Sequence, residues 1–234
     1  MRQAFWRVLF LLAVLVLASG KGFAGEPYAA SGFYVGGDFY YHAVGGDFEA
    51  DSGYQTVPPL KPAIILLGEI DNGPGWGARL GYRGPNFAVE FAYLKSRHDD
   101  FNEIFMEEGK TAIDILDLNL KYFFFSEKKL QPFLLLGASY IWLEQRDRTL
   151  VLSDDEVDPE IIEIRDAKYN NFALNAGAGL SYLVTPKVAL NTGVNYRWTE
   201  FDKNRGYETG DLDPPIDFNM VSYNLGLTYT FPFK

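Results

Sequence analysis

The feature that most constrains the fold is the final stretch of the chain, residues 218–233, which alternates between two kinds of side chain. Every second residue is apolar or aromatic: Val221, Tyr223, Leu225, Leu227, Tyr229, Phe231 and Phe233. The residues between them are small or polar: Ser222, Asn224, Gly226, Thr228 and Thr230. A period of two indicates a β-strand with one apolar and one polar face. Because the apolar face is rich in aromatic residues, the pattern is typical of a transmembrane barrel strand with a polar interior.

Seven earlier segments have a similar pattern, and together with the last one they predict an all-β fold. We expect a closed, eight-stranded, antiparallel up-and-down transmembrane β-barrel. Each segment has at least the ~9 residues that a tilted strand needs to cross a bilayer. Closure follows because an open sheet edge cannot be satisfied in hydrocarbon. The seven segments are residues 33–42, 75–83, 87–97, 113–125, 132–144, 169–184 and 188–200.

One of these segments, residues 132–144, is apolar on both faces, so its alternation alone does not orient it. Its small residues, Gly137 and Ser139, suit a crowded interior. We therefore expect the other set to face outward, namely Leu134, Leu136, Ala138, Tyr140 and Trp142.

The connections alternate between long acidic segments and short turns. Most of the 31 acidic residues lie in the long connections, residues 43–74, 97–112, 144–168 and 200–217. We expect these to be outside the cell, and the short turns to be in the periplasm with both chain ends. The most acidic run, residues 154–160, lacks the glycine and ligand spacing of a calcium loop. A divalent-cation bridge to lipopolysaccharide is an alternative to solvated carboxylates, and we predict no metal site and no cofactor.

The amino terminus predicts an export signal. Arg2 and Arg7 precede an apolar run, residues 8–17, and small residues precede Ala24. The run is shorter than the ~20 residues of a spanning helix, so we expect a signal peptide over residues 1–24. A short arm, residues 25–31, then leads into a barrel domain over residues 32–234. The net charge of −10 disfavours nucleic acid as a partner, and the absence of cysteine excludes thiol chemistry.

The carboxyl-terminal strand also resembles the sorting signal of bacterial outer-membrane barrels. Asn224, Gly226, Tyr229 and Phe231 occupy its specified positions, although three residues follow the final aromatic here. The whole pattern resembles the small eight-stranded outer-membrane barrels, such as the OmpA transmembrane domain, OmpX and the opacity proteins. This resemblance implies a bacterial outer-membrane location, a monomer, insertion by the barrel-assembly machinery, and contact with outer-membrane lipid and lipopolysaccharide.

Alternation places seven charged residues inside the predicted barrel: Asp38, Arg79, Arg83, Glu90, Asp117, Lys121 and Arg197. An eight-stranded barrel is just wide enough for side chains to fill it, so these charges must pair. We expect a lumenal charge network that plugs the barrel. The tight turn at residues 84–85 predicts a register with Arg79 directly opposite Glu90, and Asp117 is the alternative partner of Arg79.

Two other features bear on function. His42 and His98 are expected as solvated residues at the rim, and neither is followed by the serine of the His-x-Ser pairing found in serine-type barrel enzymes. We therefore predict no catalytic residue. The apolar segment 57–67 in the first long connection is expected to pack on the rim or fold into the mouth, with a partner-binding patch as the alternative.

The resemblance implies a structural or surface-interaction role through the acidic connections. It leaves two alternatives open, because small barrels serve several functions on one fold. One is a narrow porin-like channel for small solutes, and the other is an outer-membrane enzyme that acts on lipid.

Overall fold

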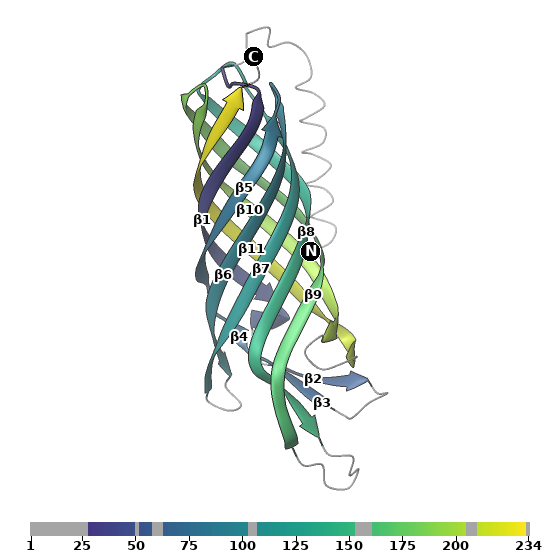
Figure 1. Ribbon diagram of the computed structural model, residues 1–234. Helices are drawn as coiled ribbons and strands as arrows, with labels where there is room; N and C mark the ends of the chain where they lie inside the picture. Colours follow the sequence, from purple (N-terminus) through teal and green to yellow (C-terminus); the bar gives the residue numbers. More distant parts are fainter. Residues whose placement is uncertain are drawn as a thin grey trace.

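The computed structural model describes residues 28–49, 52–57, 63–102, 107–152, 161–204 and 210–232. Eight long strands form a closed antiparallel ring in which each pairs with the next in the chain and the last pairs with the first (Figure 1). The predicted eight-stranded up-and-down barrel is confirmed. The ring consists of β1 (Gly32–Gly46), β5 (Gly73–Arg83), β6 (Phe87–Asn102), β7 (Glu107–Phe123), β8 (Leu130–Leu152), β9 (Ile161–Thr185), β10 (Val188–Asn204) and β11 (Gly210–Pro232).

The remaining elements lie between β1 and β5. They are η1, a 3-10 helix (Asp47–Glu49), and three short strands, β2 (Ser52–Val57), β3 (Ala63–Leu67) and β4 (Glu69–Ile70). In the part of the chain that the structure describes, no helix is long and apolar enough to cross a membrane. The predicted signal peptide, residues 1–24, lies outside the described residues.

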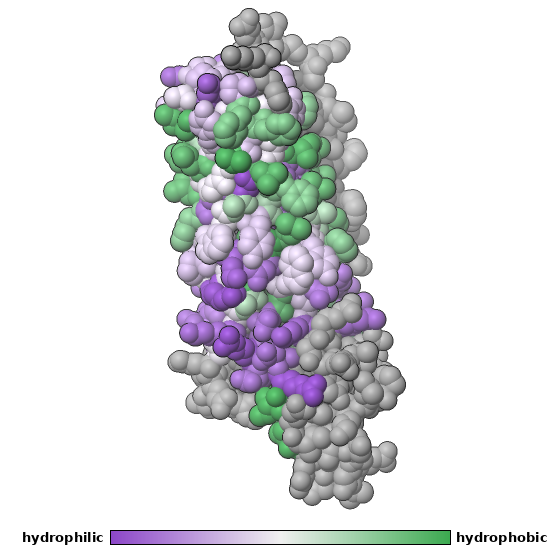
Figure 2. Space-filling model, viewed as in Figure 1, coloured by the Kyte–Doolittle hydropathy of each residue, from purple (hydrophilic) through white to green (hydrophobic). Residues whose placement is uncertain are grey.

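The ring wall has the two faces that the alternation predicts. On β11, Leu225 is 55% exposed on the outside, whereas Ser222 is 1% exposed inside. The ambiguous strand β8 has the predicted orientation, because Leu136 and Trp142 are exposed and Ser139 is buried. Hydrophobic side chains cover much of the visible wall, and hydrophilic ones follow them toward the end where β2 and β3 lie (Figure 2).

One end of the ring, here called the turn end, carries the short turns. The amino-terminal arm crosses this end: the Tyr28 N–H donates to the Ser126 carbonyl at 2.9 Å, and the Ala30 N–H to the Pro186 carbonyl at 2.8 Å. Ala29 packs with Leu183 and Ala189 in a small apolar cluster. The arm therefore joins two turns that are far apart in the sequence.

At the opposite end, here called the loop end, several strands are longer than predicted. β8 continues to Leu152 and β9 begins at Ile161, so the expected loop 144–168 is mostly strand. The expected loops 97–112 and 200–217 are likewise largely strand. These predictions were wrong because they took a lipid-facing apolar pattern as the mark of a strand. Beyond the bilayer, a strand needs a paired neighbour but no lipid-facing apolar face.

At the loop end, the same 11-stranded sheet takes a second path through β2 and β3. The β2–β3 hairpin joins β11, through Leu212 and Thr56, to β8, through Thr149 and Ile65. We call this assembly the loop-end sheet; its strand order is β9-β8-β3-β2-β11-β10. It comprises β2, β3 and residues 146–152, 161–173, 199–204 and 210–217. Within the first long connection, β2 and β3 thus pair with each other and bridge two distant ring strands.

The loop-end sheet encloses an apolar core. Phe48 of η1 is fully buried, and its ring lies edge-on to Tyr169, Phe201 and Phe218, with centroids 6.0, 6.5 and 5.9 Å away. Ile65 and Leu67 of β3 are fully buried in the same cluster. The end of the apolar segment 57–67 therefore folds into the mouth of the ring, as predicted; residues 58–62 lie outside the described residues.

Candidate functional site

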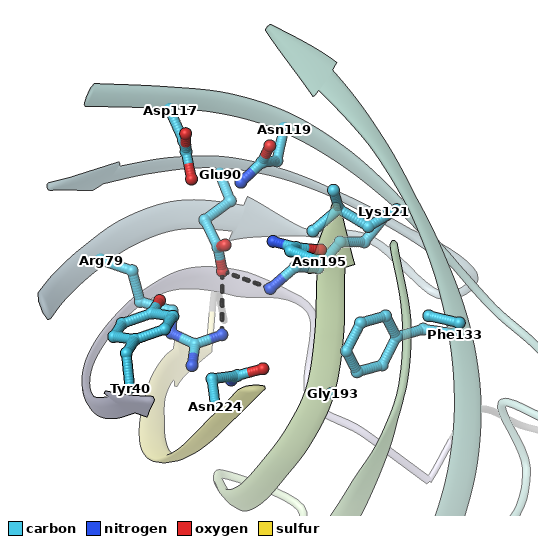
Figure 3. A pocket seen from close by; sticks show the side chains of 12 residues that line it. Tyr40, Arg79, Glu90, Asp117, Asn119, Lys121, Phe133, Gly193, Asn195 and Asn224 are labelled. Carbon is cyan, nitrogen blue, oxygen red and sulfur yellow. Dashed lines mark hydrogen bonds and ion pairs between the residues drawn. The ribbon is translucent and has the colours of Figure 1, made fainter. Parts of the chain in front are cut away.

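The candidate site is the interior of the ring, where one charge centre surrounds Glu90. Its Oε2 atom lies 2.7 Å from Lys121 Nζ and 3.4 Å from Arg79 Nη1, and it accepts a 2.9 Å hydrogen bond from the Tyr34 hydroxyl. Figure 3 shows Arg79 and Lys121 converging on this carboxylate from different strands. All these groups are buried, so each charge is balanced inside the wall.

Arg79 has a second partner in Asp38 of β1. The Arg79 Nε–H donates to Asp38 Oδ2 at 2.6 Å, and Nη2 contacts the other carboxylate oxygen. Asp38 Oδ1 also accepts from the Asn224 amide at 3.2 Å. Because β1 and β11 pair to close the ring, this carboxylate lies directly at the seam.

The second charge centre joins Asp117 and Arg197, which is fully buried. Arg197 Nη2 lies 2.5 Å from Asp117 Oδ2, and its Nη1 donates to the Ser222 hydroxyl at 2.8 Å. Asp117 also accepts a 2.6 Å bond from Ser139, which in turn accepts from Asn175 at 2.8 Å. The chain of contacts crosses the lumen from β7 to β10, so it fixes opposite walls relative to each other.

Arg83 lies apart from these centres, at the turn end. Its guanidinium lies 3.9 Å from the centroid of the Phe123 ring and contacts Gln131. Gln131 in turn donates to the backbone carbonyls of Ser126 and Lys128, at 2.7 and 2.8 Å. The structure therefore brings six of the seven predicted residues into two centres and places Arg83 in a separate one that closes the turn end.

The predicted register of β5 and β6 was wrong. Arg79 is opposite Ala92, and Glu90 is opposite Gly81, which is a shift of two residues from the expected pairing. The contact between Arg79 and Glu90 is diagonal, and Asp117 pairs with Arg197 rather than with Arg79. A shift of two residues leaves every side chain on the same face of the sheet. The alternation of side chains therefore could not distinguish the predicted register from the observed one.

The two histidines are not solvated, which corrects the expectation of rim residues. His42 is fully buried and His98 is 2% exposed, and their rings lie 6.0 Å apart. His42 Nδ1 lies 2.8 Å from Ser222 Oγ; His98 Nε2 lies 2.9 Å from Ser96 Oγ and its Nδ1 2.8 Å from the Asp71 carbonyl. Both belong to the inward-facing sets of strands that continue past the predicted rim.

Little free space remains between these side chains. The cavity beside Glu90 and Lys121 measures about 10 Å³, room for roughly one water molecule. Toward the loop end the lumen continues into the apolar core around Phe48. Among the described residues, no three His, Asp or Glu side chains form a group that could hold a metal ion.

A larger hollow of about 390 Å³ lies on the outside of the wall, where β9 and β10 separate. Phe172, Leu174 and Trp198 line it together with Ala138, and Glu200 and Asp202 line it as well. We call it the wall groove. The sequence did not reveal this groove, because it depends on where the ladder between two strands ends.

The residues of the predicted sorting signal lie on β11 with their side chains divided between the two faces. Tyr229 and Phe231 are exposed on the wall, with ring centroids 4.9 Å apart. Asn224 and Gly226 face inward, and a Cβ atom at Gly226 would collide with the carboxylate of Asp38. The glycine is therefore required by packing at the seam.

Other lumenal residues also bond to the network, among them Tyr34, Asn119, Ser139, Asn175 and Ser222. Alternation along the predicted strands puts these five on inward faces but assigns them no role. One signal could have revealed their role. Each is a polar residue on an inward face, and a neighbouring strand has a charged residue at the same height in the barrel.

Nearly the whole chain matches one protein family. Residues 10–231 match the model of the outer membrane protein beta-barrel domain. A search of curated proteins gives no match.

Solved structures with a similar fold include Neisserial surface protein A, at 17% sequence identity and a TM-score of 0.52 over 87% of this chain and 99% of that one. The outer membrane protein AlkL has 17% identity and a TM-score of 0.52 over 92% and 96% of the two chains. A major outer membrane protein from Thermus thermophilus has 11% identity and a TM-score of 0.50 over 86% and 100%. At these identities the likeness shows the fold alone.

Proposed function

Because the chain belongs to the outer membrane protein beta-barrel domain family, and is thus a bacterial outer-membrane protein, we propose a role for it as a closed, non-conducting barrel. In this proposal the ring anchors the protein in the bilayer, and the loop-end sheet with its acidic connections interacts with partners outside the cell. The filled lumen supports this over the narrow-porin alternative.

The observation that carries the proposal is the buried pairing of charges across the lumen. A water-filled pore exposes its polar lining, whereas Arg197, Asp117, Glu90 and Lys121 here have at most 5% of their surface exposed. The apolar core around Phe48 adds a second barrier at the loop end. An ion would have to break both the charge network and the apolar core to pass.

Planar-bilayer recording of the refolded protein tests the closed state. We expect no single-channel current steps at voltages where porins conduct. Flotation of the same preparation with lipid vesicles is the control, because it separates a closed barrel from one that failed to insert. Reproducible current steps from inserted protein would contradict the proposal and favour the narrow porin.

Protease treatment of intact cells tests which end faces outward. We expect cleavage near Arg205, in the acidic connection between β10 and β11. Arg148 and Arg165, which the sequence placed in another long connection, belong to β8 and β9 and should be cut more slowly. Cleavage that requires permeabilised cells would invert the proposed orientation.

We infer no catalytic role for the histidines, in contrast to the lipid-enzyme alternative. Both rings are enclosed by the barrel, and His98 is oriented by a backbone carbonyl rather than by a carboxylate. His42→Ala and His98→Ala should leave the lipid composition of expressing cells unchanged. A change in lipid products with either variant would contradict this inference.

A further inference from the structure

The loop-end sheet is an open sheet within the described residues, unlike the ring below it. The ladder between β9 and β10 ends at the pair Leu174–Trp198. Beyond this pair, β9 continues on β8 as far as Ile161, and β10 continues on β11 as far as Asn204. The two strands therefore form the opposite edges of the sheet order β9-β8-β3-β2-β11-β10.

Two side chains mark the point where these edges separate. The Asn171 amide donates to the Glu200 carbonyl at 2.7 Å and accepts from the Phe172 N–H at 2.8 Å. The Thr199 hydroxyl donates to the Phe172 carbonyl at 2.7 Å. Side chains thus replace the first backbone hydrogen bonds that the ladder no longer makes, and they hold the base of the opening in place.

These contacts also show which backbone groups face the opening. The carbonyls of Phe172 and Glu200 point toward the opposite edge, since the side chains of that edge bind them. Backbone direction alternates along an antiparallel strand. The register shifts beside Asp166 and Asp202 have their extra residues on β8 and β11, so along β9 and β10 the N–H and C=O groups of Asn170, Asp166 and Asp202 point the same way. Such an edge is a template for pairing with another strand.

The wall groove lies at the base of this opening and provides an apolar binding surface. Its volume is about 390 Å³, and Phe172, Leu174 and Trp198 form its apolar lining. At the far end of the β9 edge, Ile161 and Ile164 are 51% and 55% exposed. A strand that pairs with the β9 edge would therefore find apolar side chains at both ends of that edge.

Strand direction determines what fits between the edges. β9 and β10 are antiparallel, so one added strand would be parallel to one of them, whereas two antiparallel strands can be antiparallel to both. The molecule already uses that solution on the other side of the same sheet, where the β2–β3 hairpin fills the space between β11 and β8 with antiparallel pairs throughout.

We propose that the β9 and β10 edges bind a β-hairpin of a partner protein, whose turn points toward the membrane and places an aromatic or large apolar side chain in the wall groove. This inference rests on the proposed surface-interaction role and names its site and the class of partner. The bound hairpin would complete a second eight-stranded ring at the loop end.

A tethered peptide provides the test. The chain has no cysteine, so Ile161→Cys gives one attachment point at the tip of β9. A synthetic hairpin with two arms of about five residues, an Asn-Gly turn and a tryptophan beside it is linked there by a disulfide. The link raises its effective concentration. The control peptide has the same side chains but is N-methylated at the amides that face the edges.

Amide hydrogen exchange of the protein in lipid nanodiscs is the measurement. We expect exchange at Asp166, Asn170 and Asp202 to slow at least tenfold with the hairpin, and to be unchanged with the N-methylated peptide. Ala138→Trp, which fills the wall groove, should weaken the protection. Val184→Trp adds the same side chain on the wall near the turn end and should not.

Three results would overturn the proposal: slow exchange at these amides before any peptide is added, equal protection by the N-methylated peptide, or no protection by either. Its failure is distinguishable from failure of the proposed function. A conducting lumen would refute the closed barrel without affecting hydrogen exchange at the edges, and absent protection in a non-conducting protein would refute the hairpin site alone.

Discussion

The same strands enclose two interiors of opposite polarity: the interior of the ring is polar and charged, and the interior of the loop-end sheet is apolar. The inward face of β7 shows the change: Asp117, Asn119 and Lys121 belong to the charge network, and the next inward residues toward the loop end, Ile115 and Ile113, are fully buried in the apolar core. The outward face changes in the other direction, from exposed Leu118 to Asp114, which contacts Lys95 and Tyr93.

This inversion follows from what surrounds each part of the wall. Within the bilayer, lipid already provides an apolar environment outside, so hydrophobic burial gives little reason to prefer the inside, and paired polar groups fill it. In water, removing apolar surface from solvent is the dominant stabilising contribution, and the loop-end sheet has an ordinary apolar core. Four perturbations separate the two regions, from the largest expected effect to the smallest.

The largest effect is expected on the lipid-facing side of the ring. Tyr229→Ser combined with Phe231→Ser changes no lumenal contact, yet it removes both aromatic positions of the sorting signal. We expect the chain to accumulate in the periplasm, as measured by membrane fractionation. Phe172→Ser with Leu174→Ser is the matched control on the wall of β9. Normal outer-membrane yield of the β11 variant would show that the signal is dispensable.

The next largest effect is expected in the charge network. Asp117→Ala leaves Arg197 buried without its carboxylate, which typically costs about 3–5 kcal/mol of unfolding free energy. Urea unfolding in lipid vesicles, followed by tryptophan fluorescence, measures it. Asp114→Ala is the control: its ion pair with Lys95 is partly exposed at 3.9 Å and should contribute less than about 1 kcal/mol. Equal costs would mean that the lumen is effectively wet.

The apolar core should respond locally. Phe48→Ala removes a fully buried ring, a change that costs roughly 3 kcal/mol or more in protein cores. We expect faster amide exchange in β2, β3 and the ends of β10 and β11, with the β5–β6 ladder unaffected. Phe39→Ala, on the lipid-facing side of β1, is the control. Loss of protection throughout the ring would show that the two interiors unfold as one unit.

The smallest effect concerns how Arg79 divides its interaction between two carboxylates. Double-mutant cycles should give a coupling energy for Arg79 with Asp38, bonded at 2.6 Å, that exceeds the coupling with Glu90, at 3.4 Å. Within the usual range for contacting residues, we expect about 1 kcal/mol for the Glu90 pair. Strict additivity of Arg79→Ala and Glu90→Ala would show that the diagonal pair is not energetically coupled.

The same comparison explains how much the sequence could reveal. Within the ring, alternation oriented the other strands because lipid demands an apolar outer face, whereas the small residues Gly137 and Ser139 oriented the doubly apolar β8. It could not determine the register, since Arg79 facing Ala92 and Arg79 facing Glu90 give identical faces. The lumenal position of these residues and the contact of Arg79 with Glu90 were therefore predictable. The pairing of Asp117 with Arg197 and the separate place of Arg83 were not.

At the loop end the sequence was a poorer guide. Charged residues such as Arg165 and Asp166 looked like loop, yet they belong to β9, because a strand in water needs no lipid-facing stripe. The burial of His42 and His98 was missed for the same reason: the strands that carry them continue past the predicted rim. The wall groove depends on where a ladder ends, which no local pattern records.

The collision that a side chain at Gly226 would make with Asp38 has a consequence for how the barrel closes. A slip of β11 along β1 by two residues would satisfy both faces of each strand, but it would bring Thr228 or Asn224 to the position opposite Asp38. Only in the native alignment is the residue opposite that carboxylate a glycine, which leaves room for it. The glycine of the sorting signal thus also determines how the barrel closes. Several alignments of the last strand on the first would satisfy the hydrophobic pattern, and the glycine selects one of them.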